Sequence, residues 1–147
     1  MADVVLTLSL LLKVFTVYFA CVAVFTLLRH RGFAKAAPAT RFAVLVAARN
    51  EETVIGDLVA SLKRQNYPAD LADIYVIPNN CTDYTEAVAA ASGAEIIHCL
   101  GQVRSKGDAL REAFRQLLPK DYDAFVVFDA DNVVHPDFLG HMNNAFQ

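Results

Sequence analysis

The sequence predicts an α/β fold, in which a parallel sheet with flanking helices follows an N-terminal transmembrane helix. Two observations predict this fold. An unbroken apolar stretch comes first. Runs of β-branched and aromatic residues then alternate four times with amphipathic segments, over about a hundred residues. Strand–helix order of this kind gives a parallel sheet with right-handed crossovers, a nucleotide-binding type of half-domain.

The apolar stretch covers residues 4–28 and carries one charge, Lys13. As a helix it would measure about 37 Å, enough to cross a bilayer core of about 30 Å. A lysine at mid-span costs roughly 2.5–3.5 kcal/mol, and its ammonium can snorkel or face another helix. A cleaved signal peptide is the alternative. It is disfavoured because the stretch is long, lacks a preceding basic region and is followed by the positive charges.

A basic segment follows the apolar stretch and contains no acidic residue. By the positive-inside rule it places the rest of the chain in the cytoplasm, at the inner face of the cell membrane, with the N-terminus outside. We therefore expect a transmembrane anchor at 1–31, a linker at 32–40 and a globular part at 41–147, with the lipid bilayer as a partner. The basic residues are Arg29, Arg31, Lys35 and Arg41.

The globular part is acidic. Residues 42–147 contain eight Lys or Arg and 15 Asp or Glu, a net charge of −7. Without a basic stripe, such a domain is a poor candidate for binding nucleic acid. The three cysteines are scattered, odd in number and in no metal-binding spacing, which favours a reducing compartment and argues against disulfides or a zinc site. They are Cys21, Cys81 and Cys99.

The first strand is expected at residues 42–48, an apolar run typical of a buried strand. Asn50 is a candidate N-cap for the helix after it, with Glu51 and Glu52 in the first turn, where the helix dipole favours acids. Tyr67-Pro68 closes this segment. The apolar face of the helix has the i, i+3, i+4, i+7 spacing and consists of Ile55, Leu58, Val59 and Leu62.

The next two strands are expected at 74–77 and 95–98. Between them Thr82 is a candidate N-cap for a helix that runs to Ala91, and Gly93 ends it. Ser105 caps the helix after the third strand. That helix stops at Pro119 and carries Leu110, Ala113, Phe114 and Leu117 on one side.

The fourth strand is expected at 125–128, buried on both faces, with Asp129 and Asp131 directly after it. Ligands of open parallel sheets bind beyond the carboxyl ends of the strands. Two carboxylates there favour a divalent cation such as Mg2+ or Mn2+, which binds carboxylates together with substrate phosphates. The alternative is a turn residue and a helix N-cap. A last helix starts at Pro136, with Phe138, Leu139 and Met142 facing inward.

Polar clusters thus follow all four strands at one edge of the sheet. Caps and turns also gather at strand ends, so each cluster alone is ambiguous. No glycine-rich phosphate loop is present, which removes support for a dinucleotide or P-loop fold. The clusters are Arg49-Asn50-Glu51, residues 79–83, Ser105-Lys106-Gly107 and Asp129-Ala130-Asp131.

In this order, the clusters resemble the family 2 glycosyltransferases, nucleotide-sugar-dependent enzymes with a GT-A fold. The resemblance covers residues 41–147 and extends to the membrane-anchored bacterial branch related to cellulose and hyaluronan synthases. The residues that carry it are Val44-Leu45-Val46-Ala47-Ala48-Arg49-Asn50-Glu51-Glu52, Asn80-Cys81-Thr82-Asp83, Lys106-Gly107-Asp108-Ala109-Leu110 and Phe128-Asp129-Ala130-Asp131-Asn132.

The resemblance implies a donor site for a nucleoside-diphosphate sugar, with UDP-sugar expected. Lys106 would lie by the diphosphate, and Asp129-Ala130-Asp131 would be the metal-binding D-x-D, with Asp131 the likelier direct ligand of Mn2+ or Mg2+. The residues implied for the uridine pocket are Ala48, Arg49 and Glu51, and those near the base and ribose are Asn79, Asn80 and Asp83.

Two departures from the family matter. Asn79 stands where the family usually has aspartate, after an unusual Pro78, and an amide offers a donor as well as an acceptor to the base. The family's general base and acceptor-site motifs would lie beyond Gln147, so no catalytic residue is identified. We expect this chain to carry the donor-binding half of the enzyme, and its sequence does not identify the acceptor.

Two alternatives remain. One is a truncated, non-catalytic, membrane-tethered nucleotide-binding module. The other is a haloacid-dehalogenase-like phosphatase, because residues 126–133 also fit its hhhhDxDxV pattern, in which the first aspartate is a nucleophile. That motif belongs on a first strand with a long chain after it, whereas here it follows the fourth.

Overall fold

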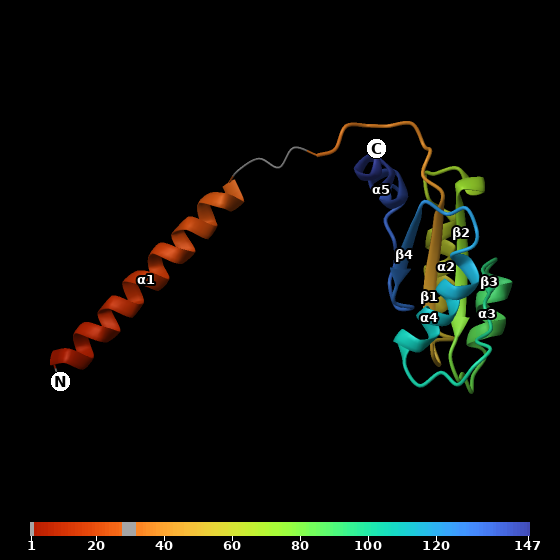
Figure 1. Ribbon diagram of the computed structural model, residues 1–147, viewed down its shortest axis with the longest axis horizontal. Helices are drawn as coiled ribbons and strands as arrows, with labels where there is room; N and C mark the ends of the chain where they lie inside the picture. Colours follow the sequence, from red (N-terminus) through yellow and green to blue (C-terminus); the bar gives the residue numbers. More distant parts are fainter. Residues whose placement is uncertain (1, 28–31) are drawn as a thin grey trace. The chain divides into compact units, whose positions relative to one another are not determined.

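The chain forms two compact units, Met1–Gly32 and Phe33–Gln147. The computed structural model describes residues 2–27 and 32–147, and each unit is considered by itself (Figure 1). The basic residues Arg29 and Arg31 lie outside the described residues. The predicted anchor, linker and domain boundaries stay a prediction.

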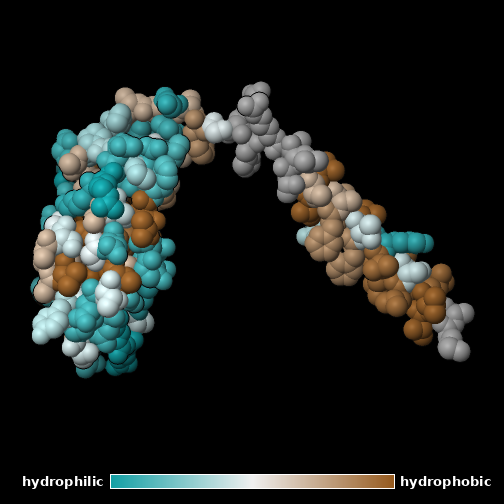
Figure 2. All heavy atoms as spheres, turned by 180° about the vertical axis from the view of Figure 1, so that it is seen from behind, coloured by the Kyte–Doolittle hydropathy of each residue, from teal (hydrophilic) through white to brown (hydrophobic). Residues whose placement is uncertain are grey.

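The described residues of the first unit form one helix, α1 (Ala2–Leu27). Its segment Asp3–Phe25 is long and apolar enough to cross a membrane, and none of it is buried within the structure. Figure 2 shows hydrophobic side chains along this helix. The hydroxyls of Thr7 and Thr16 each donate to a carbonyl one turn earlier, both at 2.8 Å, so they need no water. A signal sequence passes the same length and composition test, so anchoring stays a prediction.

The second unit is built on a four-stranded, all-parallel sheet in the order β3-β2-β1-β4. The four predicted strands are present, and the third is shorter than expected. Beyond its end, the Ile97 N–H still donates to the Val76 carbonyl at 2.9 Å. The strands are β1 (Phe42–Ala48), β2 (Ala72–Pro78), β3 (Glu95–Ile96) and β4 (Ala124–Phe128).

Helices cover both faces of this sheet (Figure 1). Phe42, Val44 and Val46 of β1 pack in the core that also contains residues of α2, α3 and α5. Ala43 and Leu45 pack in the core on the α4 side. β1 is therefore buried on both faces, as its continuous apolar run predicted. The helices are α2 (Ile55–Lys63), α3 (Thr85–Ala91), α4 (Lys106–Leu117) and α5 (Phe138–Phe146), with a short 3₁₀ helix η1 (Ala69–Leu71).

The order in which the chain adds strands to the sheet reverses after β3. It first moves outward from β1 to β2 and β3, with α2 and α3 on one face. It then returns through α4, on the other face, to place β4 on the free side of β1. The strand order therefore reverses at β1, between β2 and β4, and ligands of open α/β sheets bind beyond the carboxyl ends of the strands at such a point.

The prediction that the fourth strand is buried on both faces was wrong. β4 pairs only with β1 among the described strands, and Val127 is 42% exposed. An apolar run indicates a strand but does not show whether a neighbour will cover it.

Two predicted N-caps were also wrong. Asn50 does not cap α2, which begins at Ile55 after an uncapped Val54, so Glu51 and Glu52 precede the helix. Thr82 does not cap α3, which begins at Thr85. Local sequence favoured these caps, but the side chains bond the neighbouring loop instead, as described below. In contrast, the predicted Ser105 cap is confirmed: its hydroxyl accepts from the Asp108 N–H at 3.1 Å.

Much of the segment predicted as a linker is held against α5. The buried Asn143 amide accepts from the N–H groups of Ala39 and Thr40, both at 3.1 Å, and donates to the Ala37 carbonyl at 3.1 Å. Asn144 accepts from the Ala36 N–H at 2.9 Å. Residues 36–40 are thus a hydrogen-bonded part of the second unit.

Candidate functional site

A cavity of about 360 Å³ lies at the carboxyl ends of β1 and β4, where the chain direction reverses. We call it the carboxylate cavity. It brings together eight of the ten site residues predicted from sequence. They are Ala48, Arg49, Glu51, Asn79, Lys106, Asp129, Ala130 and Asp131, and the cavity wall also includes Ala47, Arg104 and Ser105.

The turn after β4 presents both aspartates to this cavity. Ala130 is 5% exposed and packs into the core, while Asp129 and Asp131 on either side of it are exposed. The Asn132 N–H closes the turn on the Asp129 carbonyl at 3.2 Å. α5 begins only at Phe138, so the N-cap part of the alternative was wrong, while its turn part is confirmed.

The two carboxylates differ in their contacts. Asp129 forms an ion pair with the Lys106 ammonium. Asp131 makes no hydrogen bond or ion pair with any residue in the described part of the chain. Asp131 is therefore free to act as a ligand, and Asp129 can become one by releasing Lys106.

The start of α4 adds positive potential to the cavity. Lys106 is the first residue of this helix, and the N-terminus of a helix attracts anions such as phosphate. The N–H of Arg104 and the capping Ser105 both lower the pKa of Asp108 in the first turn. The ionised Asp108 carboxylate accepts from the Arg104 N–H at 3.2 Å, which fixes the approach to the helix.

The loop after β1 is fixed by the loop after β2. Asn50 has a positive φ of 56°, and its side-chain oxygen accepts from the Thr82 N–H at 2.8 Å. The Glu51 N–H donates to the Thr85 hydroxyl at 2.8 Å. The Glu52 carboxylate accepts from the Tyr84 N–H at 2.8 Å. These bonds position Arg49 and Glu51 at the cavity wall.

Asp83 takes part in these hydrogen bonds between the loops after β1 and β2. It lines neither the carboxylate cavity nor the second cavity described below. One carboxylate oxygen accepts from the Glu52 N–H at 3.1 Å, and the other accepts from the Thr85 N–H and hydroxyl. Burial raises the pKa of Asp83, but these hydrogen bonds outweigh it, so the pKa lies below its ordinary value. Direct contact of Asp83 with a base or ribose stays a prediction.

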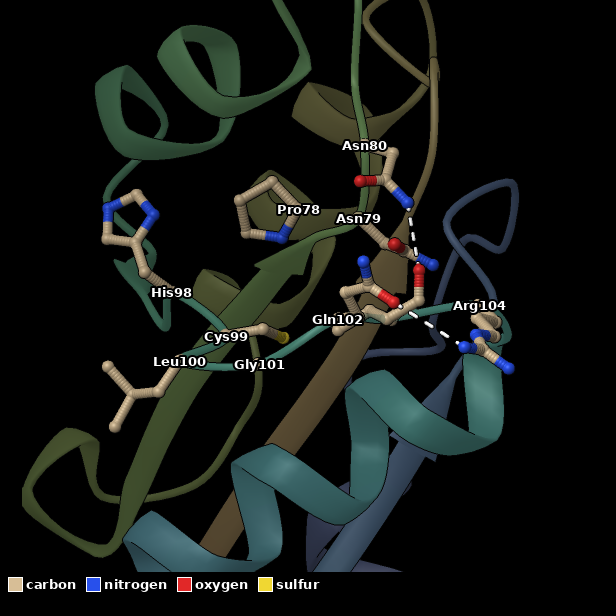
Figure 3. A pocket seen from close by; sticks show the side chains of 10 residues that line it. Pro78, Asn79, Asn80, His98, Cys99, Leu100, Gly101, Gln102 and Arg104 are labelled. Carbon is tan, nitrogen blue, oxygen red and sulfur yellow. Dashed lines mark hydrogen bonds between the residues drawn. The ribbon is translucent and has the colours of Figure 1, made fainter.

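A second cavity, of about 710 Å³, adjoins the first (Figure 3). We call it the amide cavity. Its walls are the end of β2, from Pro78 to Asn80, and the chain 98–104 between β3 and α4. Asn80 donates to the Val103 carbonyl at 3.0 Å and so ties the two walls together. Because Asn79 and Arg104 line both cavities, the two form one continuous site.

Asn79 is the most buried polar side chain of this site, at 8% exposure. Its backbone N–H is fixed to the Ala48 carbonyl at 2.8 Å. Its buried side-chain oxygen has no hydrogen-bond partner. An unpaired buried acceptor costs about 1–3 kcal/mol, and no hydrogen bond holds the amide in this orientation.

Sequence reasoning missed Arg104 as a site residue. It stands in an irregular segment, where no periodicity predicts the direction of a side chain. Its position just before the Ser105 cap was the available signal, since residues leading into a helix N-terminus often face an anion site.

The described residues contain no group of three or more His, Cys, Asp or Glu able to hold a metal by themselves. That does not fit a zinc site, which needs three or four protein ligands. It does fit Mg2+ or Mn2+, which protein sites often bind through one or two carboxylates plus substrate phosphates. Asp129 and Asp131 are the residues that would hold such an ion.

This fold is a partial GT-A fold. A solved mannosyltransferase from Pyrobaculum calidifontis, in complex with GDP-Man and Mn2+, shares the fold with a TM-score of 0.72 and 21% identity. The match covers 87% of this chain and 39% of the other. Residues 38–147 match the family described as glycosyltransferase like family 2, and the chain belongs to this family.

Two curated relatives are closer to this chain in sequence. The β-monoglucosyldiacylglycerol synthase of Synechocystis sp. is 32% identical over 114 residues, which cover 74% of this chain and 23% of that protein. Protein RfbJ of Shigella flexneri is 31% identical over 68% of this chain and 74% of its own length. The chain thus spans about a quarter of the length of the first relative.

A solved relative has ligands in its site. Glucosyl-3-phosphoglycerate synthase from Mycobacterium tuberculosis, in complex with Mn2+, UDP and glucosyl-3-phosphoglycerate, is 31% identical with a TM-score of 0.56. The match covers 69% of this chain and 37% of the other. Family membership leaves the phosphatase alternative without support, as does the position of the Asp-x-Asp after the last strand rather than the first.

Proposed function

We propose that this chain carries the donor-binding part of a metal-dependent glycosyltransferase that uses a nucleoside-diphosphate sugar, with UDP-sugar the expected donor. One observation carries the proposal. Asp129, Asp131, Lys106 and the N-terminus of α4 meet in one cavity at the reversal point of the sheet. This arrangement combines two carboxylates able to bind a metal with an ammonium group and a helix N-terminus able to bind a diphosphate.

The roles within the site follow from the chemistry of the side chains. A bound Mn2+ or Mg2+ would act as a Lewis acid and stabilise the leaving nucleoside diphosphate. Lys106 would leave Asp129 and pair with the diphosphate, beside the N-terminus of α4. The Asn79 amide, whose oxygen has no hydrogen-bond partner, would contact the base. Arg49, Glu51 and Ala48 shape the wall on the β1 side.

We assign no general base. General base catalysis needs a group within hydrogen-bond reach of the acceptor hydroxyl. Among the residues described here, we assign the carboxylates of Asp129 and Asp131 to the metal, and Glu51 to the donor pocket. A nucleotide-binding module without turnover would share all of this donor chemistry, and it differs only in failing to consume a donor sugar.

We further propose that α1 anchors the chain in the cell membrane, with the glycosyltransferase domain on the cytoplasmic face. The length and composition of Asp3–Phe25 support the anchor, as does the relative named β-monoglucosyldiacylglycerol synthase. The test is a pair of fusions after Gln147. Green fluorescent protein should fluoresce there and alkaline phosphatase should be inactive. The reverse pattern would overturn the orientation.

The donor-site proposal is tested by calorimetric titration of the detergent-solubilised chain with UDP, in Mn2+ and then in EDTA. We expect UDP to bind in Mn2+ and to lose at least tenfold in affinity in EDTA, because the diphosphate is held through the metal. Uridine, which lacks the diphosphate, is the matched control and should show no metal dependence. Equal UDP affinity in both conditions would refute the metal role.

A further inference from the structure

Asn79 stands where the two cavities join, and its surroundings leave its amide unfixed. The side chain is 8% exposed, and its oxygen has no partner. No described residue makes a hydrogen bond with either end of the amide, whereas the neighbouring Asn80 amide is tied to the Val103 carbonyl. The last torsion of an asparagine is broad and two-fold, so the Asn79 amide can present either its oxygen or its nitrogen to a ligand.

This freedom matters because nucleobases fall into two hydrogen-bonding classes. Uracil and guanine present a ring N–H beside a carbonyl. Cytosine and adenine present a bare ring nitrogen beside an amino group. An amide complements either edge by turning over, since it has one acceptor and one pair of donors. A carboxylate only accepts, so it complements the ring N–H of the first class and repels the bare nitrogen of the second.

No described residue in the wall of the amide cavity has a carboxylate that would select one class of base over the other. The side chains around it include three amides and no Asp or Glu. Besides Asn79 and Asn80, the third amide is Gln102, which is exposed and accepts from the Arg104 guanidinium at 3.5 Å. The cavity, at about 710 Å³, is within the range of ligand pockets and does not restrict the base to a pyrimidine by size.

We propose that Asn79 is the base-reading residue of the donor site, and that its neutral amide makes the site accept nucleoside diphosphates of both hydrogen-bonding classes. The proposal rests on the proposed function, because it concerns the donor of the same site. Asn79 thus sets the base specificity of the site, and this specificity is low because the Asn79 amide is uncharged.

The test is calorimetry of the full detergent-solubilised chain in Mn2+ with UDP, GDP, CDP and ADP. The wild-type chain should bind all four with affinities within about tenfold of one another. Asn79→Asp should keep UDP and GDP and weaken CDP and ADP by a further tenfold or more, since a buried polar group facing an unmatched partner is strongly disfavoured. Gln102→Glu adds the same charge to the same cavity and should leave the ratios between nucleotides unchanged.

Each other outcome overturns a definite claim. Wild-type preference for one class by much more than tenfold would refute the low selectivity. Unchanged ratios in Asn79→Asp, or a shift equal to that in Gln102→Glu, would show that Asn79 does not read the base. Absence of binding by all four nucleotides in Mn2+ would refute the proposed donor site itself, and this inference with it.

Discussion

The Lys106 ammonium at the start of α4 is paired with the carboxylate of Asp129 at the end of β4. The pair joins the two elements that meet at the reversal point of the sheet. Both side chains are partly exposed, at 45% and 67%, so the pair is worth only a modest free energy. A ligand with a metal and a diphosphate can separate the pair and give each partner a new counter-charge.

Removing the Lys106 ammonium should therefore strengthen the binding of the metal and weaken the binding of the nucleotide. In Lys106→Met, Mn2+ alone should bind about two- to fivefold more tightly, because Asp129 no longer has a competing cation. UDP in saturating Mn2+ should bind more weakly by about tenfold, because a charge-assisted contact is lost. Electron paramagnetic resonance of free Mn2+ and calorimetry with UDP measure the two effects.

The matched control is Arg111→Met, which removes a cation from an exposed position of the same helix, where it pairs with Asp108. Neither binding constant should change by more than about twofold. If Lys106→Met weakened Mn2+ binding, or left UDP binding intact, the role of this ion pair in the site would be wrong.

The hydrogen bonds of Asp83, which join the loops after β1 and β2, predict that stability depends on pH. The pKa of Asp83 is lower in the folded chain than in the unfolded chain, because hydrogen bonds to the carboxylate outweigh burial. Its contribution to stability is thus fully present above the unfolded value of about 4, and is lost as the pH falls through the folded value. Chemical unfolding across pH 2–6 should show this loss in wild type and a smaller loss in Asp83→Asn.

Asp121→Asn serves as the control, since Asp121 is exposed and accepts no hydrogen bond from any described residue. Its acid profile should follow that of wild type. A profile of Asp83→Asn that is indistinguishable from wild type would mean that the hydrogen bonds of Asp83 do not stabilise the loops.

The amide of Asn143 predicts a large stability effect far from the site. It is 1% exposed and satisfies the N–H groups of Ala39 and Thr40, the Tyr67 hydroxyl and the Ala37 carbonyl. Asn143→Ala leaves the two N–H groups and the Ala37 carbonyl unpaired, while the Tyr67 hydroxyl keeps its bond to the Thr40 carbonyl at 2.8 Å. The free energy of unfolding should therefore fall by about 3 kcal/mol.

For comparison, Asn144 makes a single bond, to the Ala36 N–H. Asn144→Ala should cost about 1 kcal/mol, measured in the same urea titration. Equal effects of the two variants would show that residues 36–40 are not held by the Asn143 amide.

Local patterns predicted those features whose causes are local. β1 was predicted at its observed bounds, because a continuous apolar run fits a central parallel strand. The Ser105 cap was predicted because its partner, the Asp108 N–H, lies three residues on. The ends of parallel strands share one sheet edge, and that geometry gathered the clusters into the carboxylate cavity.

Features that depend on distant partners were missed. Asn50 bonds Thr82, 32 residues away, and no local signal distinguishes that use of an asparagine from a helix cap. The exposure of Val127 depends on which strand lies at the edge, which the topology decides. Arg104 was missed because an irregular segment has no period from which the direction of a side chain can be inferred.

The central claim is that Asp129 and Asp131 bind a divalent ion that binds the diphosphate of the donor. The most direct measurement compares UDP binding to wild type and to Asp131→Asn by calorimetry in Mn2+. Asp131 is exposed and makes no contact that stabilises the fold among the described residues. The variant should therefore keep the wild-type melting temperature and lose at least tenfold in UDP affinity in Mn2+, with no loss in EDTA. Unchanged affinity in Mn2+, in a variant that melts like wild type, would contradict the claim.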